Sequence, residues 1–271
     1  RYQRERNTTG VRLKDRVNEY ELRVARSLEG DLPGSSAAGE QPKFLAYLED
    51  ERHVLVKFSP PLGTPKGRRW GDLLVAESVA LETLREDLEI PTAQTEIITT
   101  ENRIFLESTR FDRIGARGRK GCLTFASLEL EWLGSPSVWA ASAKAMLQAK
   151  KISKHDATTI QLVDAFGAWI ANTDRHYGNL SFFFEPEWNH AVLAPIYDML
   201  PMFFAPNENE DTEFDRTWTI PLPHPDTLLV WDRARAAAEK FWGKVAKHPE
   251  VSPEFRKIAR TISDRLMRES R

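Results

Sequence analysis

Three polar residues in the second half of the chain have the types and the spacing that phosphoryl transfer requires. Asp174 precedes Asn179 by five residues, and Asp198 follows an apolar, hairpin-like run. In phosphoryl-transfer sites with this interval, the aspartate accepts the proton of the acceptor hydroxyl, and the asparagine and a later aspartate bind Mg²⁺. The pattern predicts that Asp174 is a catalytic base and that Asn179 and Asp198 are metal ligands.

The same residues also have a purely structural interpretation. Asp and Asn are common in turns because their side chains bond to nearby backbone groups, so this interval alone is more often structural than catalytic. The flanking sequence favours catalysis, because the apolar segment 165–170 runs directly into the polar loop and a strand-like run follows at 180–184. The polar cluster is therefore bracketed by core elements.

A lysine in the first half of the chain is a candidate for binding phosphates. Lys57 ends the apolar run 54–56, where kinases carry a lysine that contacts the α- and β-phosphates. Such a lysine needs a carboxylate to orient it, and Glu77 is the first candidate, with Glu82 and Glu86 assigned to the solvated side of the same helix. The alternative is that Lys57 is a solvated charge at a strand end and Glu77 a surface charge.

A loop of small residues precedes this lysine. Residues 34–39 are Gly, Ser and Ala only, so their backbone N–H groups could approach phosphates closely. The loop matches neither a Walker loop nor Gly-x-Gly-x-x-Gly, and loops of this composition are frequently ordinary turns. On its own it is a weak signal.

Other polar residues near these motifs have two interpretations each. His176 is interpreted as a scaffold residue that braces the polar loop, rather than as a base or ligand. Arg175 either screens phosphate charge or pairs with a neighbouring acid. The basic runs 66–69 and 113–120 either dock an acidic substrate or are solvated loop charges.

The composition narrows the class of protein. The chain has 271 residues, of which 41% are hydrophobic, enough for one large domain or two lobes. No run of apolar residues is long enough for a membrane span, and a net charge of −2 gives no reason to expect nucleic-acid binding. The single cysteine, Cys122, excludes an intrachain disulfide and indicates a reducing compartment, hence the cytoplasm. Because the chain begins at Arg1, we expect that an upstream part has been removed or left out.

The hydrophobic periodicity predicts a strand-rich first half and a helix-rich second half, hence an α+β fold. Helices are expected at 11–28 and 72–87, hairpins at 44–58 and 95–111, and helical regions at 123–171 and 226–268. The expected divisions are a tail and amphipathic helix at 1–29, a β-rich lobe at 30–112 and a helical lobe at 113–271.

Four ordered motifs resemble the HipA family of serine/threonine kinases, the toxin components of bacterial toxin–antitoxin pairs. The resemblance runs from about residue 30 to the C-terminus and is nearest to the YjjJ-type branch, whose members carry an upstream helix-turn-helix segment that is not visible here. The motifs are Gly39-Glu40-Gln41-Pro42-Lys43-Phe44, Arg110-Phe111-Asp112-Arg113, Asn172-Thr173-Asp174-Arg175-His176-Tyr177-Gly178-Asn179 and Tyr197-Asp198-Met199-Leu200-Pro201.

The resemblance implies a bilobed, protein-kinase-like fold, with a β-rich N-lobe, an all-α C-lobe and an ATP cleft between them. It implies ATP and Mg²⁺ as cofactors, with Asp174 as base, Asn179 and Asp198 as Mg²⁺ ligands and Lys57 on the phosphates. The remaining ATP contacts would come from a phosphate loop of Ser35, Ser36, Ala37, Ala38, Gly39, Glu40 and Gln41 and from a hinge of Thr109, Arg110 and Phe111.

The resemblance also implies an activity and partners. The γ-phosphoryl group would go to a Ser or Thr of a protein, an aminoacyl-tRNA synthetase being one candidate. Autophosphorylation of a loop serine would add about two negative charges; Ser36 aligns best, and Ser35 is the alternative. An antitoxin is a further expected partner. Lipid or small-molecule kinases, an ATP-binding pseudokinase and a DNA-binding regulator are the competing functions, and neither membrane nor direct nucleic-acid binding is expected of this segment.

Overall fold

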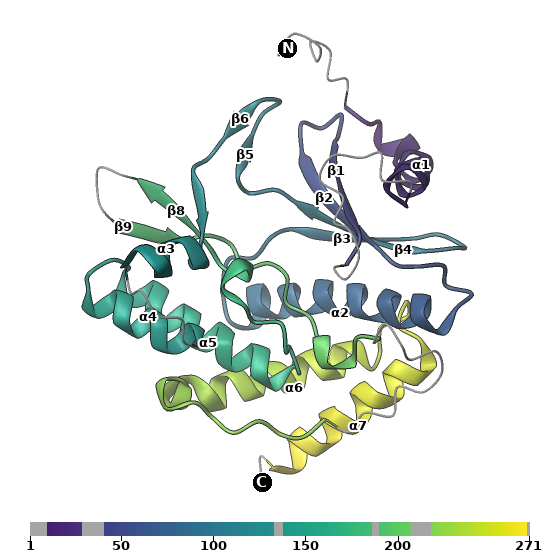
Figure 1. Cartoon of the computed structure of the whole chain (residues 1–271). Helices are drawn as coiled ribbons and strands as arrows, with labels where there is room; N and C mark the ends of the chain where they lie inside the picture. Colours follow the sequence, from purple (N-terminus) through teal and green to yellow (C-terminus); the bar gives the residue numbers. More distant parts are fainter. Residues whose placement is uncertain (1–9, 29–40, 133–137, 186–189, 207–217, 270–271) are drawn as a thin grey trace.

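The first half of the chain contains a four-stranded antiparallel sheet (Figure 1). The computed structural model describes residues 10–28, 41–132, 138–185, 190–206 and 218–269. Strands β1 (Lys43–Tyr47) and β2 (His53–Phe58) form one hairpin, β3 (Thr95–Thr99) and β4 (Ile104–Thr109) form the other, and the order across the sheet is β1-β2-β4-β3. Both expected hairpins are confirmed.

The two faces of this sheet are covered by different helices. Helix α1 (Arg16–Leu28) packs Tyr20 and Val24 against one face, in a small core that includes Phe105 of β4. The neighbours of Phe105 in β4, Ile104 and Leu106, belong to the large core on the other face, since successive side chains of a strand point to opposite sides. The expected helix at 11–28 begins later than predicted, at residue 16, because a short 3₁₀ turn precedes it.

Helix α2 (Pro65–Asp87) starts seven residues before the predicted start at Asp72. Thr64 caps it by accepting a hydrogen bond from the backbone N–H of Gly67 at 2.9 Å, and Pro65 occupies the first turn, where its missing N–H is not needed. The basic run 66–69 therefore lies in the first helical turns, not in a loop. Gly67 is required there, because a Cβ would lie 2.0 Å from the carbonyl oxygen of Pro61.

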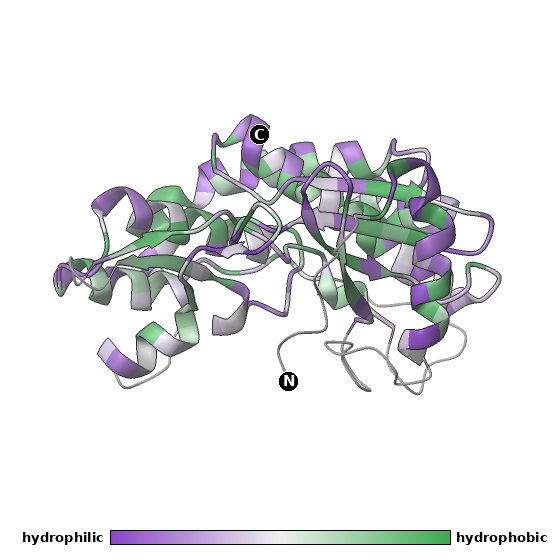
Figure 2. Cartoon of the chain, turned by 90° about the horizontal axis from the view of Figure 1, so that it is seen from above, coloured by the Kyte–Doolittle hydropathy of each residue, from purple (hydrophilic) through white to green (hydrophobic). Residues whose placement is uncertain are grey.

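The second half is mainly helical. Helices α4 (Trp139–Gln148), α5 (Lys154–Trp169), α6 (Trp231–Val245) and α7 (Pro253–Glu269) pack in sequence order, and α2 packs on α6. Seen from above, hydrophobic residues follow the strands and the helix faces that meet them (Figure 2). No helix in the described part of the chain combines the length and the apolar character needed to cross a membrane.

The expectation of an all-α second lobe needs correction, although the α+β class is right. A three-stranded sheet, β7 (Cys122–Thr124), β8 (Ser181–Glu185) and β9 (His190–Leu193), lies there beside the short helix α3 (Phe125–Trp132), and β5 (Arg113–Ile114) pairs with β6 (Gly118–Arg119). Strand β7 pairs with a strand almost 60 residues later, and local periodicity carries no signal for so short and distant a partner.

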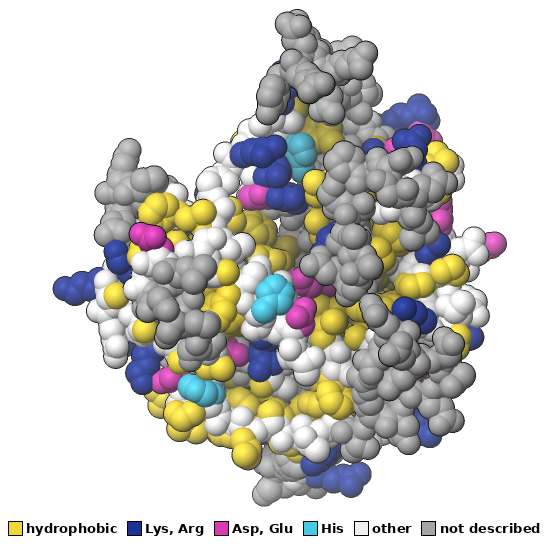
Figure 3. All heavy atoms as spheres, in the orientation of Figure 1, with side chains coloured by type: hydrophobic (Ala, Val, Ile, Leu, Met, Phe, Trp, Pro, Cys, Tyr) yellow, Lys and Arg dark blue, Asp and Glu magenta, His cyan; other side chains and the backbone are white. Residues whose placement is uncertain are grey.

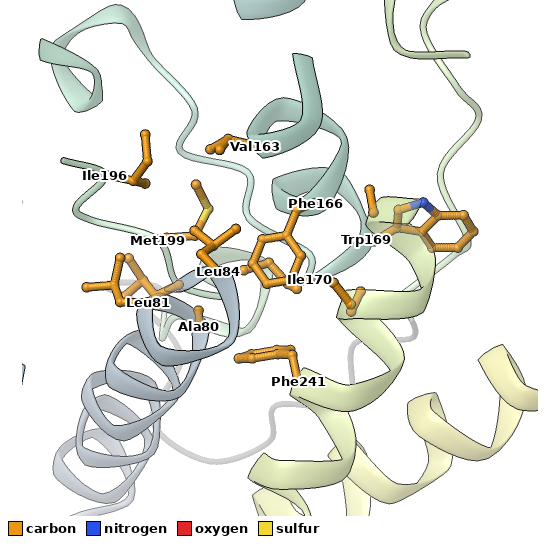
Figure 4. Close-up of a cluster of buried hydrophobic side chains, with 14 of the residues drawn as sticks. Ala80, Leu81, Leu84, Val163, Phe166, Trp169, Ile170, Ile196, Met199 and Phe241 are labelled. Carbon is orange, nitrogen blue, oxygen red and sulfur yellow. The ribbon is translucent and has the colours of Figure 1, made fainter. Parts of the chain in front are cut away.

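Helix α2 joins the two halves through the large core. Figure 4 shows Ala80, Leu81 and Leu84 of α2 beside Phe166 of α5 and Phe241 of α6. All five side chains are completely shielded from solvent. The helix that supports the first sheet is thus packed into the core of the helical half, so it is not free to swing independently.

A buried polar link also ties α2 to the start of α7. Asp72 accepts hydrogen bonds from the backbone N–H and the hydroxyl of Ser252 at 2.6 and 2.7 Å. Arg69, the nearest cation, lies 3.9 Å from the same carboxylate and over the ring of Phe255. Burial raises the pKa of Asp72 to about 6.

This shift predicts a pH effect on stability. Because the folded-state pKa of Asp72 exceeds its unfolded value, the folded protein holds this proton more tightly, and the free energy of unfolding falls as pH rises from about 4 to 6. Asp72→Asn keeps the shape of the side chain but cannot ionise, so its stability should lack this pH dependence. The free energy of unfolding of the variant minus that of the wild type should therefore grow by about 3 kcal/mol from pH 4 to pH 6. Urea denaturation at pH 4 to 7 measures it, and parallel pH profiles for the two proteins would contradict it.

Candidate functional site

Lys57 lies at the centre of a buried ion-pair cluster. Its Nζ donates to both carboxylate oxygens of Glu77, at 2.8 and 2.7 Å, and to Oδ1 of Asp198 at 2.6 Å. Lys57 projects from β2, Glu77 from α2 and Asp198 from the segment after β9. The side chains of Lys57 and Glu77 are 7% and 3% exposed, whereas that of Asp198 is 26% exposed and faces the cavity. Residues 141 positions apart are therefore brought into direct contact.

The electrostatics of this cluster keep the lysine charged. Burial alone would lower the pKa of Lys57, but the carboxylates of Asp198 and Glu77 outweigh it and raise the pKa. Burial raises the pKa of Glu77, with Lys57 opposing the shift. For Asp198 the attraction of Lys57 outweighs burial and lowers the pKa. A lysine so held presents a fixed positive charge, as phosphate binding needs. Glu82 and Glu86 instead contact Lys244 of α6, and both side chains are more than 40% exposed.

The polar loop after α5 is held by its own side chains. Asn172, 1% exposed, accepts a hydrogen bond from the backbone N–H of Asp174 at 2.9 Å through Oδ1 and donates to the sulfur of Met199. Asn179 donates from Nδ2 to the backbone carbonyl of Asp174 at 2.9 Å. That bond fixes the amide so that Oδ1 is the atom left for a ligand. Burial raises the pKa of Asp174, and the charge of Asp198 acts in the same direction.

The structure places His176 and Arg175 in supporting positions. His176 accepts the backbone N–H of Gly178 on Nδ1 at 3.0 Å and caps the short 3₁₀ turn Tyr177–Asn179. Arg175 donates from Nε to Asp164 of α5 at 2.9 Å and to the carbonyl of Asn172. The side chain of Arg175 crosses Gly167. A Cβ at position 167 would lie 2.5 Å from Cδ of Arg175. Of the two interpretations of Arg175, the pairing with an acid is the one observed.

A cavity of about 370 Å³ lies between the sheet and the second half of the chain. One side is formed by residues 108–112, which include the expected hinge residues Thr109, Arg110 and Phe111. Apolar side chains that suit a flat ring come from Leu55, Ala93, Phe111 and Tyr197. Phe111 lies 5.8 Å from the ring of Tyr197, measured between centroids.

A second cavity, of about 610 Å³, adjoins the first. Lys57, Asn179, Asp198 and Lys43 line both cavities, and Asp174 lines the second one only. Gln41 is the one residue of the expected phosphate loop that the structure describes, and it lines the second cavity too. Ser35, Ser36, Ala37, Ala38, Gly39 and Glu40 lie outside the described residues.

The donor set fits Mg²⁺. Carboxylate and amide oxygens are the ligands this ion prefers, and it commonly takes only one or two protein carboxylates beside substrate phosphates and water. Asn179 and Asp198 supply such oxygens to both cavities. Among the described residues no group of three or more His, Cys, Asp and Glu side chains could form a fully protein-ligated metal site, so the rest of the coordination would fall to phosphates and water.

Sequence reasoning missed two contributors to the site. Lys43 lies opposite Lys57 in the β1–β2 register and lines both cavities. Pairing the two strands of the predicted hairpin residue by residue could have placed Lys43 beside Lys57. Tyr197 donates to the carbonyl of Gly178 at 2.8 Å and lies 2.7 Å from the hydroxyl of Ser181. It joins the two loops that carry Asn179 and Asp198. The adjacent Asp198 has φ +57°, a backbone conformation that non-glycine residues rarely adopt except where the surroundings enforce it.

The fold and the cavity residues together define a bilobed, kinase-like protein. The chain belongs to the HipA-like C-terminal domain family, whose model matches residues 35–268. It is 35% identical over 260 residues to "Toxin YjjJ" of Escherichia coli strain K12, which confirms the expected YjjJ-type branch. That match covers 94% of this chain but 58% of the relative, so the chain spans little more than half of the relative's length.

Two solved structures share the fold. One is the Shewanella oneidensis MR-1 toxin–antitoxin complex of HipA, HipB and operator DNA, with TM-score 0.57 and 15% identity over 91% of this chain and 68% of the matched chain. The other is the Helicobacter pylori proinflammatory kinase CtkA, with TM-score 0.55 and 15% identity over 83% of this chain and 89% of that one. At this identity the likenesses support the fold alone.

Proposed function

We propose that this chain is an ATP-dependent serine/threonine protein kinase of the HipA toxin type. The observation that supports it most directly is that Lys57, Asp174, Asn179 and Asp198, which come from three separate places in the sequence, line one cavity. The adjoining apolar cavity beside Thr109, Arg110 and Phe111 is the proposed adenine site.

Each residue has one task in this proposal. Asp174 orients the acceptor hydroxyl and takes its proton, and partial burial, by raising its pKa, makes it a better base. Lys57, oriented by Glu77, stabilises the phosphate oxygens of ATP. Asn179 and Asp198 hold Mg²⁺, which when bound neutralises charge on those oxygens. His176 braces the loop that carries Asp174.

Regulation and partners are also proposed. The loop serine Ser36, or its neighbour Ser35, is the proposed autophosphorylation site, and an antitoxin is a proposed partner because the Shewanella neighbour was solved with HipB. The proposed substrate is a protein, with an aminoacyl-tRNA synthetase as one candidate, and membership of the HipA-like family supports this proposal. The proposed lobes, 30–112 and 113–271, meet shortly after the end of β4. The proposed location of the protein is the cytoplasm.

A transfer assay tests the activity. The purified chain is incubated with Mg²⁺, γ-³²P-labelled ATP and bacterial cell extract, and the products are divided into protein and lipid fractions. We expect acid-stable label on Ser or Thr of protein, located by mass spectrometry. Label in the organic phase instead would identify a lipid kinase. A thermal shift with ATP but no transfer would identify a nucleotide-binding pseudokinase, and either result would overturn the proposal.

A further inference from the structure

The hairpin β5–β6 and its flanks concentrate positive charge on a chain that is otherwise acidic. Residues 110–120, defined here as the basic arm, contain five basic side chains and one acidic one, a net charge of +4. Because the whole chain carries −2, the other residues together carry −6. The basic residues of the arm are Arg110, Arg113, Arg117, Arg119 and Lys120.

Only part of this charge is neutralised within the chain. Asp112 accepts hydrogen bonds from Arg110 at 2.7 and 2.6 Å and forms an ion pair with Arg113. Arg117, Arg119 and Lys120 are exposed, and in the described part of the molecule none of them forms an ion pair with a carboxylate. Lys120 instead lies over the ring of Phe183, 3.4 Å from its centroid. Three cations are therefore available to an external anion.

The arrangement within the arm is unfavourable for the folded chain alone. Arg113 lies directly opposite Arg119 in the β5–β6 register, and like charges at opposed positions destabilise a strand pair. The two strands have two residues each and pair with no further strand among the residues that the structure describes, so little backbone pairing offsets the repulsion. Ile114 adds an apolar side chain that is 62% exposed. Departures of this kind from stable patterning are typical of functional surfaces.

The arm starts and ends in the wall of the proposed ATP cavity. Arg110 and Asp112, at its start, line that cavity, and so does Cys122, which follows its end. Arg117 follows Asp112 by five positions across the hairpin turn, so their Cα atoms lie no more than about 17 Å apart, the length of five fully extended residues. Figure 3 shows Lys and Arg side chains gathered over this part of the molecule, above the hollow between the two halves.

Contacts with the body of the protein hold the arm in place. His53, on β2, lies with Nε2 3.1 Å from the carbonyl oxygen of Gly115 in the turn. The backbone N–H of Arg110 donates to the carbonyl of His53 at 2.8 Å, and within the arm the N–H of Lys120 donates to the carbonyl of Asp112 at 3.0 Å. The arm is therefore a preorganised surface, and a partner that binds it loses less conformational entropy than one that must order a free loop.

We propose that the basic arm binds an acidic segment of the protein substrate and so brings the acceptor hydroxyl to the neighbouring cavity. Three exposed cations beside Ile114 suit a short peptide with carboxylates and an apolar side chain. A long nucleic acid suits the surface less, because the −6 charge of the remaining residues would repel the rest of its phosphates. The role in substrate delivery rests on the proposed kinase activity, whereas the binding itself does not.

Direct binding is tested without any catalysis. The probe is a fluorescein-labelled peptide of alternating Glu and Leu, and its anisotropy is measured against the wild-type chain and the variant Arg117→Ala/Arg119→Ala/Lys120→Ala. Three exposed charge pairs lead us to expect binding that is about tenfold weaker in the variant and that weakens with added NaCl. The control Lys257→Ala/Arg260→Ala/Arg268→Ala removes three exposed cations from α7 and should bind as wild type.

Three results would overturn the proposal. These are equal binding by the two triple variants, no binding by the wild type, and tighter binding of a single-stranded RNA of matched charge, which would make the surface a nucleic-acid site.

A second measurement compares phosphate transfer to extract proteins with intrinsic ATP hydrolysis. The arm variant should lose transfer while its hydrolysis stays at the wild-type rate. If the wild type showed neither phosphate transfer nor ATP hydrolysis, that result would count against the kinase proposal and leave the binding result intact.

Discussion

Asp174→Asn is expected to lower the rate of phosphoryl transfer by at least ~10²-fold, the low end for loss of a general base. The amide matches the carboxylate in shape but cannot accept the proton of the acceptor hydroxyl. The side chain of Asp174 is 48% exposed, so the substitution should change the free energy of unfolding by no more than about 0.5 kcal/mol. The measurement is a steady-state assay with labelled ATP, accompanied by urea denaturation.

The pattern of kinetic constants separates this role from a structural one. Because Asp174 lines the second cavity but not the proposed adenine cavity, the KM for ATP should change little while kcat falls. The matched control is Asp232→Asn, an exposed aspartate on α6, which should retain wild-type kcat. If Asp174→Asn turned over at the wild-type rate, Asp174 would not be the base.

Lys57→Met is expected to affect both activity and stability. The variant loses the charge that stabilises the phosphate oxygens, so transfer should fall by at least ~10²-fold. It also leaves the carboxylates of Glu77 and Asp198 without the cation that lies 2.7 and 2.6 Å from them. Removing one partner of a buried pair costs about 3 kcal/mol or more, because the remaining charge is buried and unpaired. Urea denaturation and the transfer assay measure the two effects.

Two further variants isolate the cause. Lys57→Met/Glu77→Gln removes the more deeply buried of the two unpaired carboxylates and should recover much of the lost stability, but no activity. Lys144→Met breaks an ion pair of equal length with Asp226 at a lysine that is 55% exposed, and it should cost less than about 1 kcal/mol. If Lys144→Met lowered the free energy of unfolding as much as Lys57→Met, burial of the Lys57 cluster would not explain the loss of stability.

The packing of α2 bears on how such a site could be regulated. Glu77 contacts Lys57 from a helix that is packed on α6 and whose first turns are bonded to Ser252. Swinging α2 away would disrupt that packing, so the contact between Lys57 and Glu77 is a fixed part of the fold. Regulation through the proposed serine switch or through the proposed partners would not need movement of α2.

Local sequence patterns predicted the elements well where the signal is itself local. The hairpins β1–β2 and β3–β4 follow alternation and turn residues, and α2 and α5 follow apolar periodicity. The start of α2 was misplaced because Pro65 and the basic run suggested a loop, whereas Thr64 and Pro65 form the N-terminal cap. The sheet β7–β8–β9 was not predicted, since its three-residue strand β7 depends on a partner far along the chain.

The sequence by itself determined which residues could do chemistry, because residue type and the five-residue interval from Asp174 to Asn179 are both local properties. It also carried the family motifs. Only the tertiary structure decided that Lys57, Glu77 and Asp198 meet within 2.8 Å, that Arg175 pairs with Asp164, and that Lys43 and Tyr197 belong to the site. These contacts join segments separated by up to 141 residues. The packing of α2 between the sheet and the helical core sets their distances, and no spacing along the chain encodes that packing.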